Sequence, residues 1–306
     1  MINPGIFRKP TVHPYRVECL ADLPVALQQI AGQSLAAGDP PETIIYLPQQ
    51  IVPRKFLEPA WKSIIPEQAL IFTTAGVWHL RAASPHGEAG LAAYLPGSTL
   101  LYAHLSLVLL YGRLELCGVG AEGLGRMVIE YNTVSHFLIQ PALERLLSLA
   151  WGPASADREA GSAAPFFPDL QDATLKYRNG LRNYLLKFDQ RLVGCILQPP
   201  ITGRVFGLRP RKLAPPVLVA LTDHQLVIIE EGIGNATSYG YYITYCPRRC
   251  IATIEFKKQA AWQEMIIHLS SGDAATMRMT RLEDTAAQAW QAVWAAQAAA
   301  PGFSAA

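Results

Sequence analysis

A chain of 306 residues is long enough for about two domains, each able to bury its own core. Half of the residues are hydrophobic and only 16% are charged, which excludes a chain that is disordered throughout. The sequence pI of 8.2 lies below the values above about 9 that are typical of nucleic-acid-binding domains, so no nucleic acid partner is expected.

The charge is distributed unevenly along the chain, although the net charge is only +2. Residues 31–150 hold 7 basic and 9 acidic residues, a net charge of −2. Residues 169–300 hold 15 basic and 11 acidic residues, a net charge of +4. The second half is therefore the better candidate for binding an anion.

The first half is expected to consist of strands between two helices. Residues 1–24, rich in proline and mixed polar residues, predict an irregular arm. A helix is expected over 25–36, and a second over 135–150, in which Pro141 either introduces a kink or marks a later helix start. Between them the hydrophobic pattern predicts strands at 43–47, 69–73, 77–82, 99–103, 106–110, 112–117 and 126–131.

The second half follows a small-residue, proline-containing linker at 152–168. A basic amphipathic helix is expected over 172–187, either as a surface helix packed on its own domain or as a helix lying on an anionic membrane. Seven strands and a helix over 283–299 follow, then a disordered tail at 301–306. Trp290 and Trp294 share one face of that last helix, so both are expected to be buried. The expected strands are 192–197, 217–222, 225–230, 239–244, 250–256, 262–269 and 276–280.

The two halves read as versions of each other. The segment Glu42–Pro48 resembles Arg191–Leu197, and Leu70–Leu80 resembles Val217–Ile228, with Thr74 opposite Thr222. The spacing between the matched segments is the length of a domain rather than of a solenoid repeat. The sequence therefore predicts two related domains in tandem.

This order of elements resembles the pleckstrin-homology-like (PH-like) superfold, and the second half is similar to bacterial PH-like and GRAM-like domains. The residues that carry the resemblance are the hairpin Leu221–Ile228, Tyr239-Gly240, Pro247, the strand Ile251–Glu255 and the helix that holds Trp290. The resemblance implies an α+β, mainly β fold of two tandem PH-like domains, 25–151 and 169–300. Each would be a leading helix followed by a bent seven-stranded antiparallel sheet or open barrel with a C-terminal helix. It also implies a role in binding proteins, peptides or lipids, without selecting one.

Four basic residues lie between the first two strands of the second domain: Arg204, Arg209, Arg211 and Lys212. In PH domains that bind phosphoinositides, this loop carries a comparable basic pattern, so the resemblance implies an anion-binding site here. Several cations on one loop can share a multiply charged headgroup, and each arginine can donate two hydrogen bonds to a phosphate. The alternative is an ordinary solvated basic loop.

Other motifs have no functional context. The Gly118–Gly123 segment spells G-x-G-x-x-G but lies between two strands, which favours a hairpin over a dinucleotide site. Cys246 and Cys250 form one C-x₃-C pair without two further ligands, so no metal is expected. No nucleophile–base motif is apparent, and no catalytic residue or cofactor is assigned.

The sequence thus favours a non-catalytic binding or scaffold protein whose partner is a protein. The alternative is peripheral recruitment to anionic lipid through the second domain, and a weaker alternative is an enzyme of unrecognised type. A cytoplasmic location is expected, with peripheral membrane association under the lipid alternative. The N-terminal segment lacks the apolar region of a secretory signal.

Overall fold

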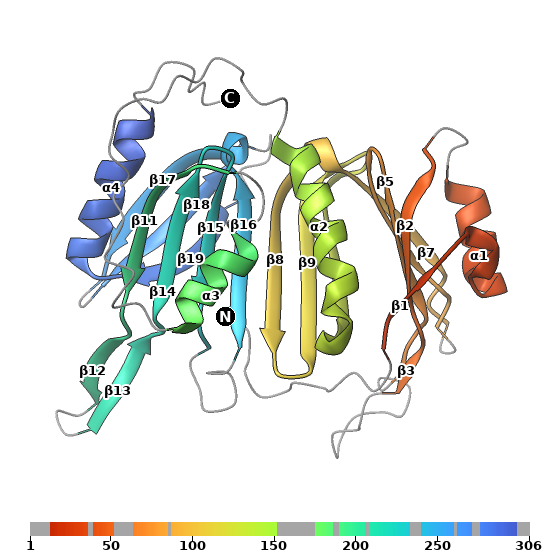
Figure 1. The fold of residues 1–306 in the computed structure, drawn as a ribbon, viewed down its shortest axis with the longest axis horizontal. Coiled ribbons are helices and arrows are strands. Elements are labelled where there is room, and N and C mark those ends of the chain that lie inside the picture. Colours follow the sequence, from red (N-terminus) through yellow and green to blue (C-terminus); the bar gives the residue numbers. More distant parts are fainter. Residues whose placement is uncertain are drawn as a thin grey trace. The chain divides into compact units, whose positions relative to one another are not determined.

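The chain forms two compact units, residues 1–152 (unit 1) and 153–306 (unit 2). The computed structural model describes residues 13–35, 39–51, 64–84, 87–151, 175–185, 190–205, 209–232, 240–259, 262–270 and 276–298. The fold is mainly β, built from antiparallel strands, as expected (Figure 1). The expected linker at 152–168 and the expected tail at 301–306 lie outside the described residues.

Unit 1 contains a sheet in the order β1-β2-β5-β6-β7, a meander β8-β9-β10, a short ribbon β3-β4 and two helices. The elements are β1 Tyr15–Val17, α1 Val25–Ser34, β2 Pro41–Leu47, β3 Gln50–Ile51, β4 Ile64–Ile65, β5 Gln68–Thr73, β6 Gly76–Arg81, β7 Leu91–Pro96, β8 Leu100–Val108, β9 Tyr111–Gly120, β10 Gly123–Asn132 and α2 His136–Trp151. Single 3₁₀ turns, η1 Leu20–Asp22, η3 Gly97–Thr99 and η4 Thr133–Ser135, connect them.

Unit 2 contains the strands β11-β14-β15-β16 in that order, a sheet β17-β18-β19, a ribbon β12-β13 and two helices. The elements are α3 Leu175–Tyr184, β11 Leu192–Gln198, β12 Ile201–Val205, β13 Arg209–Ala214, β14 Val217–Thr222, β15 Gln225–Glu230, β16 Tyr241–Pro247, η6 Arg248–Cys250, β17 Ile251–Lys258, β18 Gln263–Leu269, β19 Thr276–Leu282 and α4 Asp284–Ala298.

The two units repeat the same succession of elements. The order β2-β5-β6-β7 corresponds to β11-β14-β15-β16, and the meander β8-β9-β10 corresponds to β17-β18-β19. A two-stranded ribbon follows the first strand of each set, a helix precedes it, and a helix ends each unit. The two units therefore share one order of antiparallel strands and helices, which is the arrangement that the predicted repeat requires.

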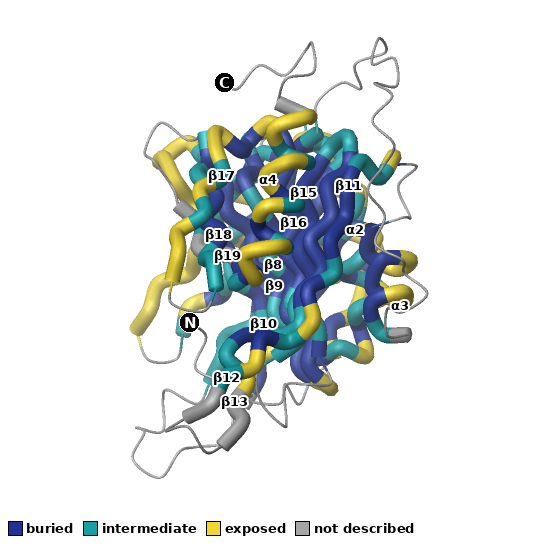
Figure 2. The backbone as a smooth tube through the Cα atoms, turned by 90° about the vertical axis from the view of Figure 1, so that its left-hand side faces the viewer, coloured by how far each residue is buried: buried dark blue, intermediate teal, exposed yellow. Residues whose placement is uncertain are grey.

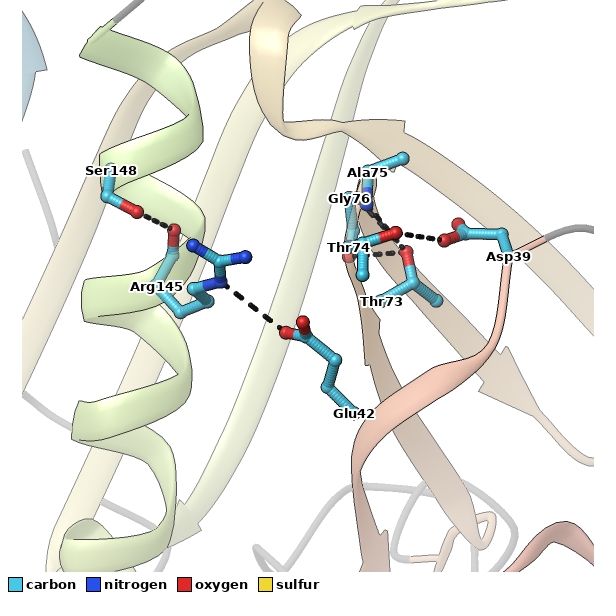
Figure 3. Close-up of polar contacts among 8 residues, drawn as sticks. All are labelled: Asp39, Glu42, Thr73, Thr74, Ala75, Gly76, Arg145 and Ser148. Carbon is cyan, nitrogen blue, oxygen red and sulfur yellow. Dashed lines mark hydrogen bonds and ion pairs between the residues drawn. The ribbon is translucent and has the colours of Figure 1, made fainter. Parts of the chain in front are cut away.

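The two units also share the hydrogen bonds of one turn, which connects β5 to β6 in unit 1 and β14 to β15 in unit 2. The Thr73 hydroxyl accepts hydrogen bonds from the backbone N–H groups of Ala75 and Gly76, at 3.3 and 3.1 Å (Figure 3). The Thr222 hydroxyl accepts from the N–H groups of His224 and Gln225, at 3.2 and 2.9 Å. Thr73, and not Thr74, is therefore the counterpart of Thr222, so the sequence match was one residue out of register.

The carbonyl of each turn also has the same partner. The Ala75 carbonyl accepts from the N–H of Gly97 at the start of η3, and the His224 carbonyl accepts from the N–H of Arg248 at the start of η6, both at 2.8 Å. A proline, Pro96 or Pro247, ends the preceding strand in both cases. These bonds hold the β5–β6 or β14–β15 turn against the beginning of the meander.

The central strands are buried on both faces, because in each unit the leading helix packs on one face of the sheet and the C-terminal helix on the other. All six residues of β5 and of β14 are buried, which explains their continuous hydrophobic runs. In unit 1, Leu27 and Ala31 of α1 pack with Ile44, Ile71 and other residues of one face. In unit 2, α3 lies against Ile229 and Tyr241, and the Tyr177 hydroxyl donates to the Pro216 carbonyl at 2.7 Å. Figure 2 shows β15 and β16 largely in the colour of buried residues.

The C-terminal helix of each unit covers the other face. Helix α2 contacts β2, β6 and β8, and Arg145 of α2 pairs with Glu42 of β2 at 3.5 Å (Figure 3). Helix α4 contacts β11, β18 and β19. Trp290 is fully buried, as expected, whereas Trp294 is only half-buried, because it lies near the end of α4, where the neighbouring Ala295 and Ala296 are exposed.

Several elements of unit 1 differ from the sequence expectation, and the short strands β3 and β4 were not expected. Strand β7 was missed, because Leu91–Pro96 is alanine-rich and follows a glycine-containing loop. The segments expected as two strands at 99–103 and 106–110 are one strand, β8, in which His104 and Ser106 alternate onto the face opposite Leu105. Strand β1 lies within the segment expected to be an irregular arm, where it pairs with β2.

Candidate functional site

Four large apolar side chains gather at one end of unit 1, a group we call the apolar end surface: Leu109, Leu110, Val134 and Phe137. They are 60%, 44%, 59% and 69% exposed. Leu109 and Leu110 form the two-residue turn between β8 and β9, while Val134 and Phe137 belong to η4 and the first turn of α2 (Figure 1). Exposed apolar groups that cluster in this way mark interaction sites more often than isolated ones do.

Hydrogen bonds through Thr133 bring the two segments together. The N–H of Thr133 donates to the carbonyl of Leu110 at 3.2 Å, and its hydroxyl donates to the carbonyl of Leu109. Asn132 caps the turn that follows, because its side chain accepts from the N–H of Val134 at 3.0 Å. The four apolar side chains are therefore held on a braced backbone rather than on separate loops.

The surface has no charge of its own. The sequence contains no Asp, Glu, Lys or Arg from residue 105 to 112 or from 131 to 143. The adjacent carboxylate, Glu130 of β10, accepts a hydrogen bond from the Tyr111 hydroxyl at 2.8 Å. Complete burial of a leucine or phenylalanine side chain stabilises by about 1.5–3 kcal/mol. Covering these four partly exposed side chains would then contribute about 4 kcal/mol before the entropy cost of association is subtracted.

The repeated fold does not require apolar residues at this place. At the corresponding end of unit 2, the end of β17, the residue after it and the start of α4 carry exposed polar side chains: Lys258, Gln259, Glu283 and Asp284. Asp284 accepts from the side chain of Gln263 at 2.9 Å and pairs with Lys258 at 3.6 Å. Among the described residues, the start of α4 is thus charged where the start of α2 is apolar, so the repeated fold does not itself require apolar side chains at the start of the C-terminal helix.

The backbone at Leu109 adds a second reason to regard the surface as functional. Leu109 has φ = 52°, the only positive φ outside glycine among the described residues. Glycine is the usual residue where a two-residue hairpin turn needs positive φ, and a side chain there costs about 1–2 kcal/mol. The side chain of Leu109 is 60% exposed, so packing within the unit offsets little of this cost.

The four predicted anion-binding residues lie in the ribbon β12-β13. The backbone pairing sets Val205 opposite Arg209, Arg204 opposite Pro210, Gly203 opposite Arg211 and Thr202 opposite Lys212. The segment is therefore a paired ribbon rather than an open loop. The side chain of Lys212 is exposed, and those of Arg204, Arg209 and Arg211 lie outside the described part of the structure.

A buried charge network occupies the meander of unit 1. Glu115 pairs with Arg113 at 2.9 Å and with Arg126 at 2.6 Å, and it accepts from the Tyr102 hydroxyl at 3.0 Å. Burial alone would raise the pKa of Glu115, but the hydrogen bonds from Arg126 and Tyr102 outweigh it and lower the pKa. Burial raises the pKa of the neighbouring Cys117 thiol. A carboxylate satisfied on three sides beside an unreactive thiol indicates a structural network.

The remaining motifs have structural explanations. Gly118–Gly123 spans the end of β9, a two-residue turn and Gly123 with φ = 98°, so it is the hairpin that the sequence favoured. A side chain at Gly118 would clash with Leu95 and Thr99. Cys246 and Cys250 are buried reduced cysteines, and no group of three metal-ligating side chains occurs in the described residues.

The sequence did not reveal the apolar end surface, because Leu109 and Leu110 extend an apolar run that reads as a buried strand. The repeat itself contains the missing information. When β8-β9 is matched to β17-β18, the leucines fall in the connection between two strands, and a turn is where apolar residues cannot be buried by their own sheet.

None of the helices in the described ranges is long and apolar enough to span a bilayer. No protein-family model matches the chain, and no curated protein is similar to it.

Proposed function

We propose that this chain is a non-catalytic binding or scaffold protein built from two tandem PH-like units, and that it engages its partner through the apolar end surface of unit 1. The PH-like assignment is supported by four plus three antiparallel strands followed by a C-terminal helix in both units. The observation that carries the binding role is the group of exposed, uncharged side chains on unit 1, on two segments that the hydrogen bonds of Thr133 hold together.

The proposal is tested by the double substitution Leu110→Ser and Phe137→Ser in the full chain. Because these side chains are exposed, the variant should keep the thermal stability of the wild type. In extracts of producing cells, the wild-type chain should elute in a larger assembly or with membranes, and the variant at the size of the free chain. Val25→Ser is the matched control, since Val25 is 67% exposed on α1. Identical elution of the wild type and the double variant would contradict the proposal.

A second candidate function, the binding of an anionic ligand by unit 2, is favoured by the ribbon β12-β13. Four basic residues occupy two short paired strands within a half of the chain that has a net charge of +4. Vesicles of anionic lipid should then sediment with the protein and neutral vesicles should not. Each basic residue near such a surface contributes about 1 kcal/mol, so Arg209→Ala with Arg211→Ala should weaken binding about thirtyfold.

The control for this experiment removes two charges elsewhere in unit 2. Arg178 and Arg182 are exposed on α3, so Arg178→Ala with Arg182→Ala changes the net charge equally. If both double variants lose the same amount of vesicle binding, the ribbon contributes only general charge attraction and not a specific site. Raising the salt concentration should weaken binding, because exposed charges are screened over about 10 Å at 0.1 M.

A further inference from the structure

We infer that β10 is a pairing edge, at which two copies of this chain associate by joining their β10 strands antiparallel about a two-fold axis at Val128. The inferred contact goes beyond the proposed binding function, because it uses a different part of unit 1. It follows from the backbone of β10, from its charges and from the corresponding strand of unit 2.

The backbone of β10 directs one row of hydrogen-bonding groups away from its own sheet. Among the described residues, β10 pairs with β9 and with no other strand, over ten residues without a bulge. The N–H of Thr133 continues this ladder by donating to the carbonyl of Leu110, so the odd-numbered residues of β10 bond to β9. The N–H and C=O groups of the even-numbered residues, from Leu124 to Glu130, therefore point towards the free side of the strand.

This edge is accessible and lacks the protections that sheet edges usually have. Residues 123–126 are exposed, and Val128 and Glu130 are partly exposed. Proteins normally prevent pairing at an edge with a very short strand, proline, lysine or a bulge. Strand β1, which ends the other sheet of unit 1, has three residues, whereas β10 has ten and contains neither proline nor lysine. A long edge of this kind is a template for pairing with another chain.

The charges along the edge select a second copy as the partner. Arg126 and Glu130 lie two residues to either side of Val128, on the same face of the strand. When two β10 strands pair about Val128, Arg126 of each copy lies directly opposite Glu130 of the other, which gives two favourable pairs of opposite charge. A centre at Met127 would instead set Arg126 opposite Val128 and Glu130 opposite Leu124.

Both charged side chains are already held in place and can bond to a second partner. Arg126 pairs with Glu115 through Nη2 at 2.6 Å, and its side chain is 57% exposed, so the guanidinium has further N–H groups to donate. Glu130 accepts from the hydroxyl of Tyr111 through Oε1 at 2.8 Å, and a carboxylate has a second oxygen. Side chains that are fixed before association lose less entropy when the two copies meet.

The corresponding edge of unit 2 does not have these properties. Strand β19 takes the place of β10 in the repeat, and its pairing with β18 is interrupted between Met265 and Ile266. Its sequence contains two arginines and no acidic residue, so joining two β19 strands would bring only like charges together. The repeated fold therefore does not itself require the regular, self-complementary edge found at β10.

The size of the contact sets the strength of the association. One pair of joined strands buries less than the roughly 1,200 Å² that is typical of stable, specific interfaces, so the dimer should be weak and reversible. Backbone hydrogen bonds between strands, rather than buried apolar area, supply the affinity in contacts of this kind.

The first test is sedimentation of the purified full chain at concentrations from about 1 to 100 µM. The wild type should show a reversible monomer–dimer equilibrium. Val128→Lys sets two positive charges opposite each other at the axis and should raise the dissociation constant at least about tenfold. Within its own sheet the new side chain lies opposite Glu115, so the variant should keep the thermal stability of the wild type. Val128→Thr, which stays β-branched and uncharged, is the matched control and should dimerise like the wild type.

The second test is cross-linking, which reports the register. Cys19 is exposed, so the variants are made in a Cys19→Ser background. Oxidation of the two thiols of Val128→Cys by copper phenanthroline should give a covalent dimer, because paired residues at the axis have Cα atoms about 5.5 Å apart. Leu124→Cys should give none, since its two copies lie about 27 Å apart in this register. This result also decides the matter if Val128→Lys loses its fold.

The opposing outcomes are distinct. A chain that stays monomeric over the whole concentration range, or a dimer that a folded Val128→Lys variant leaves unchanged, would overturn the inference. Cross-linking of Leu124→Cys but not of Val128→Cys would overturn the register and with it the charge pairing. The double variant Leu110→Ser and Phe137→Ser should dimerise like the wild type, and loss of its dimer would assign the contact to the apolar end surface instead of β10.

Discussion

At the scale of single residues, the interior of unit 1 contains a polar pair whose chemistry depends on pH. His79 of β6 lies 2.7 Å, from Nε2 to Oε1, from Gln68 of β5, and both side chains are buried. Burial lowers the pKa of His79 to about 4, and the nearby charge of Arg81 acts in the same direction. The ordinary value in an unfolded chain is about 6.5. The histidine is therefore neutral in the folded protein at neutral pH.

This pair predicts a loss of stability in mild acid. Because the pKa of His79 is lower in the folded state, its contribution is complete above pH 6.5 and is lost as the pH falls towards 4. Between pH 7 and pH 5 the loss amounts to about 2 kcal/mol. In urea unfolding at both pH values, His79→Gln should lose less stability than the wild type by this amount, and His13→Gln, at an exposed site, should not differ from the wild type. Equal losses for wild type and His79→Gln would show that His79 titrates normally.

At the scale of elements, the docking of α4 explains the stability of unit 2. Trp290 is 0% exposed and Trp294 is half-buried, although both lie on one face of the helix. Truncation of a buried tryptophan typically costs about 3–5 kcal/mol. Trp290→Ala should lower the free energy of unfolding by that amount, and Trp294→Ala by clearly less. Unfolding curves in urea would decide this, and similar midpoints for the two variants would be incompatible with the docked position of α4.

The contact between α4 and β11 provides a second prediction. A Cβ atom added to Gly194 would lie 2.5 Å from Cγ1 of Val293, closer than carbon atoms approach. Gly194→Ala should therefore destabilise unit 2 by about 1–3 kcal/mol. Adding Val293→Ala removes the clashing methyl group, so the double variant should recover part of the loss. A double variant less stable than the sum of the two single effects would exclude this packing.

The elements predicted from the sequence are those whose pattern reflects burial on one or two faces. The strands around Leu70 and Val219, and the helix of Trp290, were expected because continuous or periodic apolar runs have few alternatives. Strand β7 was not predicted, because alanine is a weak signal for a strand. The turn at Leu109 was not predicted, because a sequence does not distinguish exposed leucines from buried ones. The candidate surface was missed for the same reason, while the basic residues at 204–212 were visible as charge.

At the scale of the whole molecule, the repeat implies that equivalent substitutions in the two units should have similar effects. The hydroxyls of Thr73 and Thr222 each accept from two backbone N–H groups in the same kind of turn. Replacement by valine leaves these groups without the hydroxyl, at a cost of about 1–3 kcal/mol for each unit.

Thr73→Val and Thr222→Val should therefore cost similar amounts. Because the two sites belong to separate compact units, their effects should add to within about 0.5 kcal/mol in the double variant. Chemical denaturation of the four proteins measures both quantities. Thr74→Val is the control, since the Thr74 hydroxyl donates to the side chain of Asp39 rather than bracing the turn (Figure 3). A large loss of stability for Thr74→Val would instead support the register predicted from the sequence, in which Thr74 corresponds to Thr222.

The sequence predicted the two-fold organisation because matching apolar segments recur at the length of a domain. It did not predict that the repeat also includes contacts of the backbone, such as those from Gly97 to Ala75 and from Arg248 to His224. Such contacts depend on geometry rather than on residue type, since glycine and arginine donate the same N–H group. The same limitation hid the correct register at Thr73.

The helices that precede the sheets, α1 and α3, determine where either unit can be cut. Tyr177, Leu181 and Tyr184 of α3 are buried, and α3 lies against Ile229 and Tyr241. A fragment of unit 2 that begins at β11 lacks α3, so the sheet face with Ile229 and Tyr241 would be exposed to solvent. Such a fragment should precipitate or self-associate when expressed. A fragment of unit 2 that is soluble and folds by itself has to begin before Leu175. The smallest independent folding unit therefore consists of the sheets together with the helix that precedes them.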